Sequence, residues 1–128
     1  MADYMLLLYA TEGDEAEQAR RWGELPLWDE INESLREAGL LVANAPLHGV
    51  QTATTVRVRG GESQFTDGPF AITKEILAGY YILRCDDLDE ALKAAERLPL
   101  ARYGSIEVRP ILDVSSLPAS DGVASGQG

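Results

Sequence analysis

Short apolar runs alternate with amphipathic stretches along the chain, and their order predicts the fold. Residues 3–9 (DYMLLLY) and 75–85 (EILAGYYILRC) are apolar at nearly every position, as in strands that are buried on both faces. Residues 104–112 (GSIEVRPIL) alternate instead, with Ile106 and Val108 on one side of the predicted strand. These three segments supply the long strands of an expected sheet.

Two stretches have the period of amphipathic helices. In the first, Trp28, Ile31, Leu35 and Ala38 fall on one stripe. The second is predicted over residues 86–98. Its expected inward side holds Leu88, Ala91, Leu92, Ala95 and Leu98.

The ends of both helices carry recognisable signals. Pro26 suits the first turn of one helix, and Gly39 suits the left-handed residue just past its end. Asp87 with Glu90 three residues on has the spacing of a capping box. The preceding residues 14–22 form either a separate short helix or an ordered loop.

A β-hairpin is the clearest local signal. Residues 52–66 (TATTVRVRGGESQFT) hold two alternating runs around Gly60 and Gly61, which suit a two-residue turn with positive φ. The expected register pairs Arg59 with Glu62, Arg57 with Gln64, and Val56 with Phe65. Charged pairs then share one face of the hairpin and apolar pairs the other.

A short strand at 40–44 completes a βαββαβ order with an inserted hairpin, which predicts an α+β fold of the ferredoxin-like sandwich type. Two helices cover only one face of such a sheet. Because the long strands are apolar on both faces, we expect a second copy to cover the other face, giving a homodimer that resembles a dimeric α/β-barrel. The domain is expected over residues 1–114, with a disordered tail over 115–128.

Composition excludes several classes of protein. The 128 residues carry a net charge of −10, so no general affinity for nucleic acid or anionic membrane is expected. No apolar run reaches the ~18 residues of a membrane span, and without a secretory signal we expect a cytoplasmic protein. Cys85 is the single cysteine and ends an apolar run, which predicts a buried, inert thiol. No metal or cofactor motif is present.

Three stretches carry a resemblance to a known family. ATTVRVRGGESQFTDGPFAITKEILAGYYIL, DLDEALKAAERLP and YGSIEVRPI together resemble the DGPF branch of the YCII-related family, over residues 3–112. The resemblance implies a ferredoxin-like domain that dimerises around its sheets. It also implies no single activity. Most members have no assigned function and some are linked to alternative sigma factors, while the wider family includes a dehydrochlorinase with a His/Asp pair in its site.

The chain departs from the family pattern at two places. Some relatives carry a histidine on the first helix, where this chain has Asp29 and Asn32. After DGPF, relatives have Ala-Glu-Thr-Lys-Glu, whereas Ile72 replaces the first glutamate here. Both departures weaken an inference of acid–base chemistry from resemblance alone.

Asp67 and His48 are the candidate catalytic residues. Asp67, in the DGPF stretch, is a good turn former, and a carboxylate fixed there could also act as a base or orient a histidine. His48 is the only histidine and precedes the hairpin. Because a hairpin brings its two ends together, the pair could lie within side-chain reach and form an acid–base pair.

Four further residues are candidates for substrate contacts. Tyr80 and Tyr81 are neighbours on one strand, so one should face the helices and the other the dimer interior, where the hydroxyl of a buried tyrosine needs a partner. Lys74 and Glu75 form either a surface pair or substrate contacts.

The candidate residues are compatible with two classes of function. One is a cofactor-free acid–base enzyme that acts on a small organic molecule. The other is a non-catalytic ligand-binding or regulatory module linked to transcription.

Overall fold

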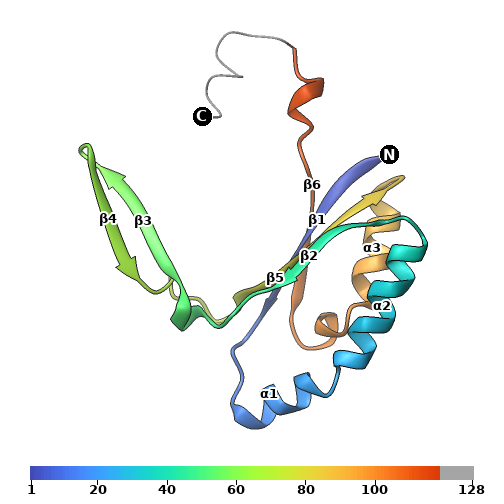
Figure 1. Cartoon of the computed structure of the whole chain (residues 1–128), viewed down its shortest axis with the longest axis horizontal. Helices are drawn as coiled ribbons and strands as arrows, with labels where there is room; N and C mark the ends of the chain where they lie inside the picture. Colours follow the sequence, from blue (N-terminus) through green and yellow to red (C-terminus); the bar gives the residue numbers. More distant parts are fainter. Residues whose placement is uncertain (119–128) are drawn as a thin grey trace.

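The computed structural model describes residues 1–118, which form an α+β domain with three helices and six strands (Figure 1). The helices are α1 (Glu15–Trp22), α2 (Leu25–Glu37) and α3 (Leu88–Arg97). The strands are β1 (Ala2–Ala10), β2 (Leu41–Pro46), β3 (Thr54–Arg59), β4 (Glu62–Asp67), β5 (Ile76–Cys85) and β6 (Ser105–Pro110). Short 3-10 turns are η1 (Val50–Thr52), η2 (Pro99–Arg102) and η3 (Val114–Ser116).

Four strands form one antiparallel sheet in the order β2-β5-β1-β6, and β3 pairs with β4 in a separate hairpin. β1 lies between β5 and β6, with Leu6 opposite Tyr81 on one side and Val108 on the other. The register of β1 and β5 shifts between Leu8 and Tyr9. This order is compatible with the expected ferredoxin-like sandwich.

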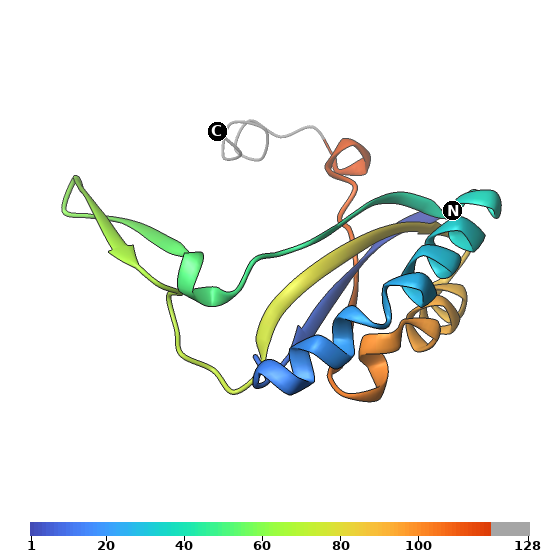
Figure 2. The ribbon, with the colours of Figure 1, turned by 60° about the horizontal axis from the view of Figure 1, so that its bottom comes forward.

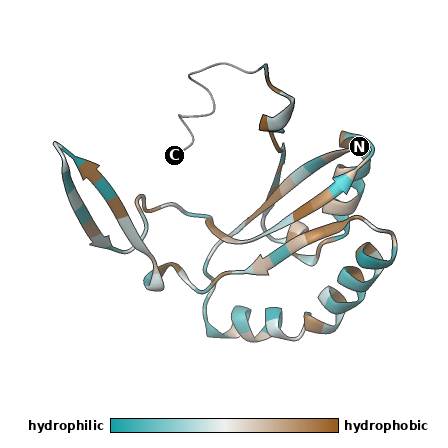
Figure 3. Cartoon of the chain, turned by 45° about the horizontal axis from the view of Figure 1, so that its top comes forward, coloured by the Kyte–Doolittle hydropathy of each residue, from teal (hydrophilic) through white to brown (hydrophobic). Residues whose placement is uncertain are grey.

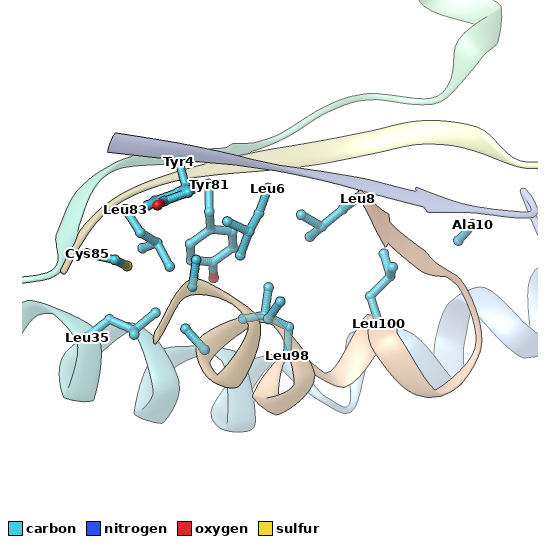
Figure 4. Close-up of a cluster of buried hydrophobic side chains, with 13 residues drawn as sticks. Tyr4, Leu6, Leu8, Ala10, Leu35, Tyr81, Leu83, Cys85, Leu98 and Leu100 are labelled. Carbon is cyan, nitrogen blue, oxygen red and sulfur yellow. The ribbon is translucent and has the colours of Figure 1, made fainter. Parts of the chain in front are cut away.

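The three helices lie on one side of the sheet (Figure 2). The side chains that point toward them form the core (Figure 4). Leu6, Leu83 and Cys85 come from the sheet and Leu35 from α2, and each of these side chains is almost fully buried. Alternate residues of β1 and β5 therefore face the helices, although the sequence of these strands is apolar throughout.

The inward side of α3 differs from the prediction. Leu88 and Leu92 were expected to face the core, but they are 46% and 45% exposed. The buried positions are Ala91, Ala94 and Ala95. Small side chains let a helix approach a sheet closely, so the alanines occupy the contact and the larger leucines lie at its margins.

The residues before α2 form a helix rather than a loop. Asp14 caps α1 by accepting a hydrogen bond from the Glu17 amide at 2.8 Å. Pro26 stands in the first turn of α2, and Gly39 has a φ of +75°, as the sequence predicts. Each helix thus begins or ends where a local signal places it.

The opposite face of the sheet is apolar and no helix covers it within residues 1–118 (Figure 2). Met5, Leu7, Tyr80 and Ile82 alternate with the core-facing residues and are half-buried. We call this surface the open face. Asp3 and Arg84 form an ion pair at 2.8 Å at its end.

The β3–β4 hairpin projects away from the body of the domain (Figure 1). Gly60 and Gly61 form its turn with φ values of +58° and +80°, which confirms the predicted turn. The register pairs Arg59 with Glu62, Arg57 with Gln64, and Val56 with Phe65, again as predicted. We call residues 54–67 the arm.

The predicted domain boundary at residue 114 falls at the start of η3. Most of the expected tail, residues 119–128, lies outside the described residues. None of the helices in the described part of the chain is long and apolar enough to cross a membrane.

The capping box of α3 generates a stability prediction. Asp87 accepts a hydrogen bond from the Glu90 amide at 2.9 Å, and the Glu90 carboxylate accepts one from the Asp86 amide at 2.8 Å. We expect Asp87→Ala to lower the free energy of unfolding by about 1 kcal/mol, measured by urea denaturation at fixed protein concentration. The control Asp89→Ala changes a carboxylate of the same turn and should cost less than about 0.5 kcal/mol. Equal effects of the two substitutions would contradict the capping role.

Candidate functional site

A cavity of about 530 Å³ opens between α1, α2 and the helix-facing side of the sheet. This volume is in the range of small-molecule sites. Its wall exposes more apolar than polar surface, and ten polar residues contribute to it. The polar lining consists of Thr11, Glu12, Gln18, Arg21, Asp29, Asn32, Asn44, His48, Gln51 and the Tyr81 hydroxyl.

Small residues of the sheet leave this space open. Ala45, Ala78 and Gly79 line the cavity where β2 meets β5. A Cβ at Gly79 would lie 2.8 Å from the Ala45 carbonyl oxygen, so the close approach of the two backbones requires glycine there. Because glycine has no side chain, position 79 also leaves space for the cavity.

Tyr81 lies at the inner end of the cavity with two asparagines. Its hydroxyl donates a hydrogen bond to Asn32 Oδ1 on α2, and Asn44 of β2 lies opposite Tyr81 in the sheet. The Trp28 ring stacks on Tyr81 with centroids 6.3 Å apart. Because Asn32 accepts this bond with its oxygen, its amide nitrogen remains able to donate a hydrogen bond.

Burial keeps the Tyr81 phenol neutral. Desolvation raises the pKa of Tyr81, and the hydrogen bonds with Asn44 and Asn32 lower it by a smaller amount. The side chain is 4% exposed. Tyr81 therefore acts as a neutral hydrogen-bonding group at neutral pH and not as a phenolate.

The rim of the cavity joins two loops that are distant in sequence. Glu12, which follows β1, accepts a hydrogen bond from the Val50 amide at 3.2 Å. His48 and Gln51 line the rim on the same loop as Val50. His48 is exposed to solvent at this rim.

A charged cluster fixes α1 at the other side of the rim. Glu17 accepts hydrogen bonds from Arg20 and Arg21 at 2.8 and 3.0 Å, and these bonds lower the pKa of Glu17 to about 2. Arg21 also donates to the Thr11 carbonyl oxygen at 2.9 Å and lies 4.5 Å from the centre of the Tyr103 ring. Arg21 thus lines the cavity, and its contacts with Glu17, the Thr11 carbonyl oxygen and the Tyr103 ring hold its side chain in place.

The two candidate catalytic residues lie in different surroundings. His48 lines the cavity, whereas Asp67 is an exposed residue at the foot of the arm, opposite Thr54. Within residues 1–118 no hydrogen bond or ion pair joins them. The next residue, Gly68, has a φ of +96° and donates to the Ala53 carbonyl oxygen at 2.7 Å. This bond extends the ladder of the arm by one pair beyond Thr54 and Asp67.

The candidate substrate contacts are also divided. Tyr81 faces the helices and lines the cavity, while Tyr80 lies on the open face opposite Leu7, so the predicted alternation is confirmed. Lys74 is exposed and Glu75 half-buried in the loop before β5, and neither lines the cavity.

Several lining residues were not predicted as site residues. Asn32 and Asn44 come from different elements and meet at Tyr81 only in the folded chain. The one available signal was Tyr81 itself, because a buried phenol needs a polar partner. Asn32 lies one turn beyond Trp28 on α2, so it faces the same direction as the apolar stripe.

The described residues offer neither a metal cluster nor a reactive thiol at the cavity. No group of three His, Cys, Asp or Glu side chains within residues 1–118 is arranged to hold a metal ion. Cys85 is fully buried in the core, and desolvation together with nearby carboxylates raises the pKa of its thiol to about 11. Cys85 is therefore protonated at neutral pH.

The raised pKa of Tyr81 predicts a pH dependence of stability. Above pH about 10 the unfolded state loses the Tyr81 proton while the folded state keeps it, so the free energy of unfolding should fall as the pH rises. In the Tyr81→Phe variant the free energy of unfolding should fall less between pH 8 and 11, because no phenol titrates at position 81. At pH 7 this variant should be less stable by about 1 kcal/mol because Asn32 loses its hydrogen-bond partner. Urea denaturation of both proteins between pH 8 and 11 measures the difference. Parallel pH profiles would show that Tyr81 titrates normally.

Comparison with known proteins places the chain in a family. It matches the YCII-related domain over residues 2–115. An uncharacterized protein of Rhizobium meliloti (strain 1021) is 38% identical over 112 residues, which cover 84% of this chain and 90% of the relative. Residues 2–115, which match the family, contain the whole four-stranded sheet, the three helices and every residue that lines the cavity. The chain therefore belongs to the YCII-related domain family.

Proposed function

We propose that this protein is a cytoplasmic homodimer that binds a small, mainly apolar organic molecule in the cavity and catalyses cofactor-free proton transfer on it. The cavity is the observation that carries the proposal, because it combines a volume of about 530 Å³ with aromatic walls and a few convergent polar groups. Trp22, Trp28 and Leu25 supply apolar surface from the helices. A flat molecule that carries polar groups fits this lining.

His48 is the proposed base. It is the histidine among the side chains that line the cavity, and imidazole is the side chain that enzymes use most often for proton transfer. In the proposed step its imidazole takes a proton from a carbon next to a carbonyl group of the bound molecule. The negative charge that develops on the carbonyl oxygen is stabilised by the Asn32 amide nitrogen. Return of the proton to another carbon gives isomerisation, and loss of a leaving group gives elimination.

One observation favours a second function. His48 is exposed, and Asp67, its expected partner, is not among the residues that line the cavity. A cavity without an oriented base suits a ligand-binding module, in which ligand occupancy signals to a regulatory partner such as a transcription factor. Both functions use the same cavity and differ in whether a proton is transferred.

Proton transfer can be tested without knowledge of the natural substrate. We expect ring-containing ketones such as cyclohexanone and 2-tetralone to raise the melting temperature of the wild-type protein by binding in the cavity. In D2O, ¹H NMR should show faster loss of the signal of the proton next to the carbonyl with wild type than with His48→Gln, by about 100-fold. An Ala78→Phe variant, which fills the cavity, is the control and should abolish both effects. Binding without enhanced exchange would favour the non-catalytic module.

The dimer is proposed from the distribution of charge and apolar surface. Residues 12–37 hold nine acidic and three basic side chains, and residues 86–97 hold five acidic and two basic ones. The helix layer thus carries nine of the ten net negative charges. The ionic groups beside the open face, Asp3 with Arg84 and Glu107 with Arg109, balance one another. Two acidic chains repel least when they meet through this neutral, apolar face.

A matched pair of substitutions tests this interface. Tyr80 lies at the centre of the open face, and Tyr80→Asp should raise the dimer dissociation constant by at least about 100-fold, because an unpaired charge is costly to bury. Leu92→Asp makes the same kind of change on the exposed side of α3 and should leave the constant within about twofold. Sedimentation equilibrium measures both. A wild-type protein that sediments as a 13.9 kDa monomer at micromolar concentration would exclude the dimer.

A further inference from the structure

We infer that the arm is a second interaction surface of this chain, and that its occupant is the other copy in the dimer. This inference rests on the proposed dimer, and it adds a contact that the open face alone does not provide. The arm would reach past the edge of the sheet and pack on the body of the partner copy.

The arm is ordered but has almost no support from its own body. Of its twelve strand residues only Thr55 is half-buried, and the other eleven are exposed. An isolated two-stranded hairpin is marginally stable in water, because it lacks a third strand or a helix to pack on. A regular hairpin with a tight glycine turn therefore indicates that a partner surface covers it in the assembled protein.

The side chains of the arm divide into a polar side and an apolar side. Thr55, Arg57 and Arg59 alternate with Val56 and Val58 along β3. Val56 pairs with Phe65 across the hairpin, and these two side chains are 57% and 71% exposed, with Val58 at 58%. Figure 3 shows the apolar positions of the arm. An apolar strip on a solvent-exposed hairpin is costly in a monomer and suits an interface.

The position of the arm identifies the second copy as the occupant. Figures 1 and 2 both place the arm away from the helix layer, so a protein bound to the arm lies beside whatever covers the open face. The arm continues from β2 and leads back into β5, two strands of the sheet that carries the open face. One partner copy can therefore cover both surfaces.

The charge of the arm agrees with this assignment. Residues 54–67 hold two arginines, one glutamate and one aspartate, and so have no net charge in a chain with a net charge of −10. A neutral arm meets little repulsion from an acidic partner copy. A nucleic acid or an anionic membrane would instead favour a basic arm.

Hydrogen exchange measured by mass spectrometry tests the arm directly. Amides of residues 54–67 in the wild-type protein should exchange at least about 10-fold more slowly at dimeric than at monomeric concentrations. In monomeric Tyr80→Asp the arm should lose this protection at every concentration, while the amides of β1 and β5 remain protected by the hydrogen bonds of the sheet. Exchange in the Tyr80→Asp protein therefore measures the arm when the body is folded and no partner copy is bound.

A variant of the apolar strip tests the contact. The triple substitution Val56→Thr, Val58→Thr and Phe65→Thr keeps residues that favour strands but removes the apolar surface. It should raise the dimer dissociation constant by about 10-fold, whereas Gln64→Thr on the other side of β4 should change it by less than about twofold. A triple variant with the wild-type constant would overturn the role of the arm.

The outcomes separate the arm from the dimer itself. A wild-type dimer whose arm exchanges without protection would overturn the arm contact and leave the open-face dimer standing. An arm that is protected equally at all concentrations would show that its own chain holds it, which also overturns the inference. A wild-type monomer would overturn both proposals together.

Discussion

The architecture depends on the burial of one face of β1 and β5 beneath α2 and α3. Leu6, Leu83 and Leu35 are removed from water at this contact, and the alanines of α3 let the helix lie close to the sheet. Burial of this kind supplies most of the free energy that orders a small domain. Once the helices occupy this face, the other apolar face has no helix over it within residues 1–118, and the surface available for assembly follows from the fold.

The cavity arises where this packing is incomplete. On β5 the core-facing Tyr81 and Leu83 are large, but opposite Pro46 at the end of β2 the close backbones require Gly79, and Ala78 lies beside it. α2 begins with Leu25 and Trp28 over this part of the sheet, and their side chains form the wall of a space that they do not fill. A backbone constraint therefore creates the room, and Tyr81 with its asparagine partner places polar groups in it.

The sequence was sufficient for features that depend on neighbours along the chain. The Gly60-Gly61 turn, the Asp87 cap and the left-handed Gly39 were predicted and are present. The inward side of α3 was predicted only in part, because periodicity could not show that alanines rather than Leu88 and Leu92 would occupy the contact. The partners of Tyr81 were missed since they come from α2 and β2, and no local pattern links these segments. The pairing of His48 with Asp67 depends on how residues 49–51 fold, which no local pattern determines, so it stays a prediction.

The segment between β2 and β3 connects the two surfaces of the molecule. Residues 47–51 supply His48 and Gln51 to the rim of the cavity, and the chain then enters the arm. The rim is tied to the body by the bonds from the Val50 amide to Glu12 and from the Leu47 amide to the Ala78 carbonyl oxygen, at 3.2 and 2.9 Å. A partner copy that holds the arm would restrict this segment from its other end. Assembly would then stabilise the position of His48 at the cavity, so the dimer and the cavity form one functional unit in the proposal.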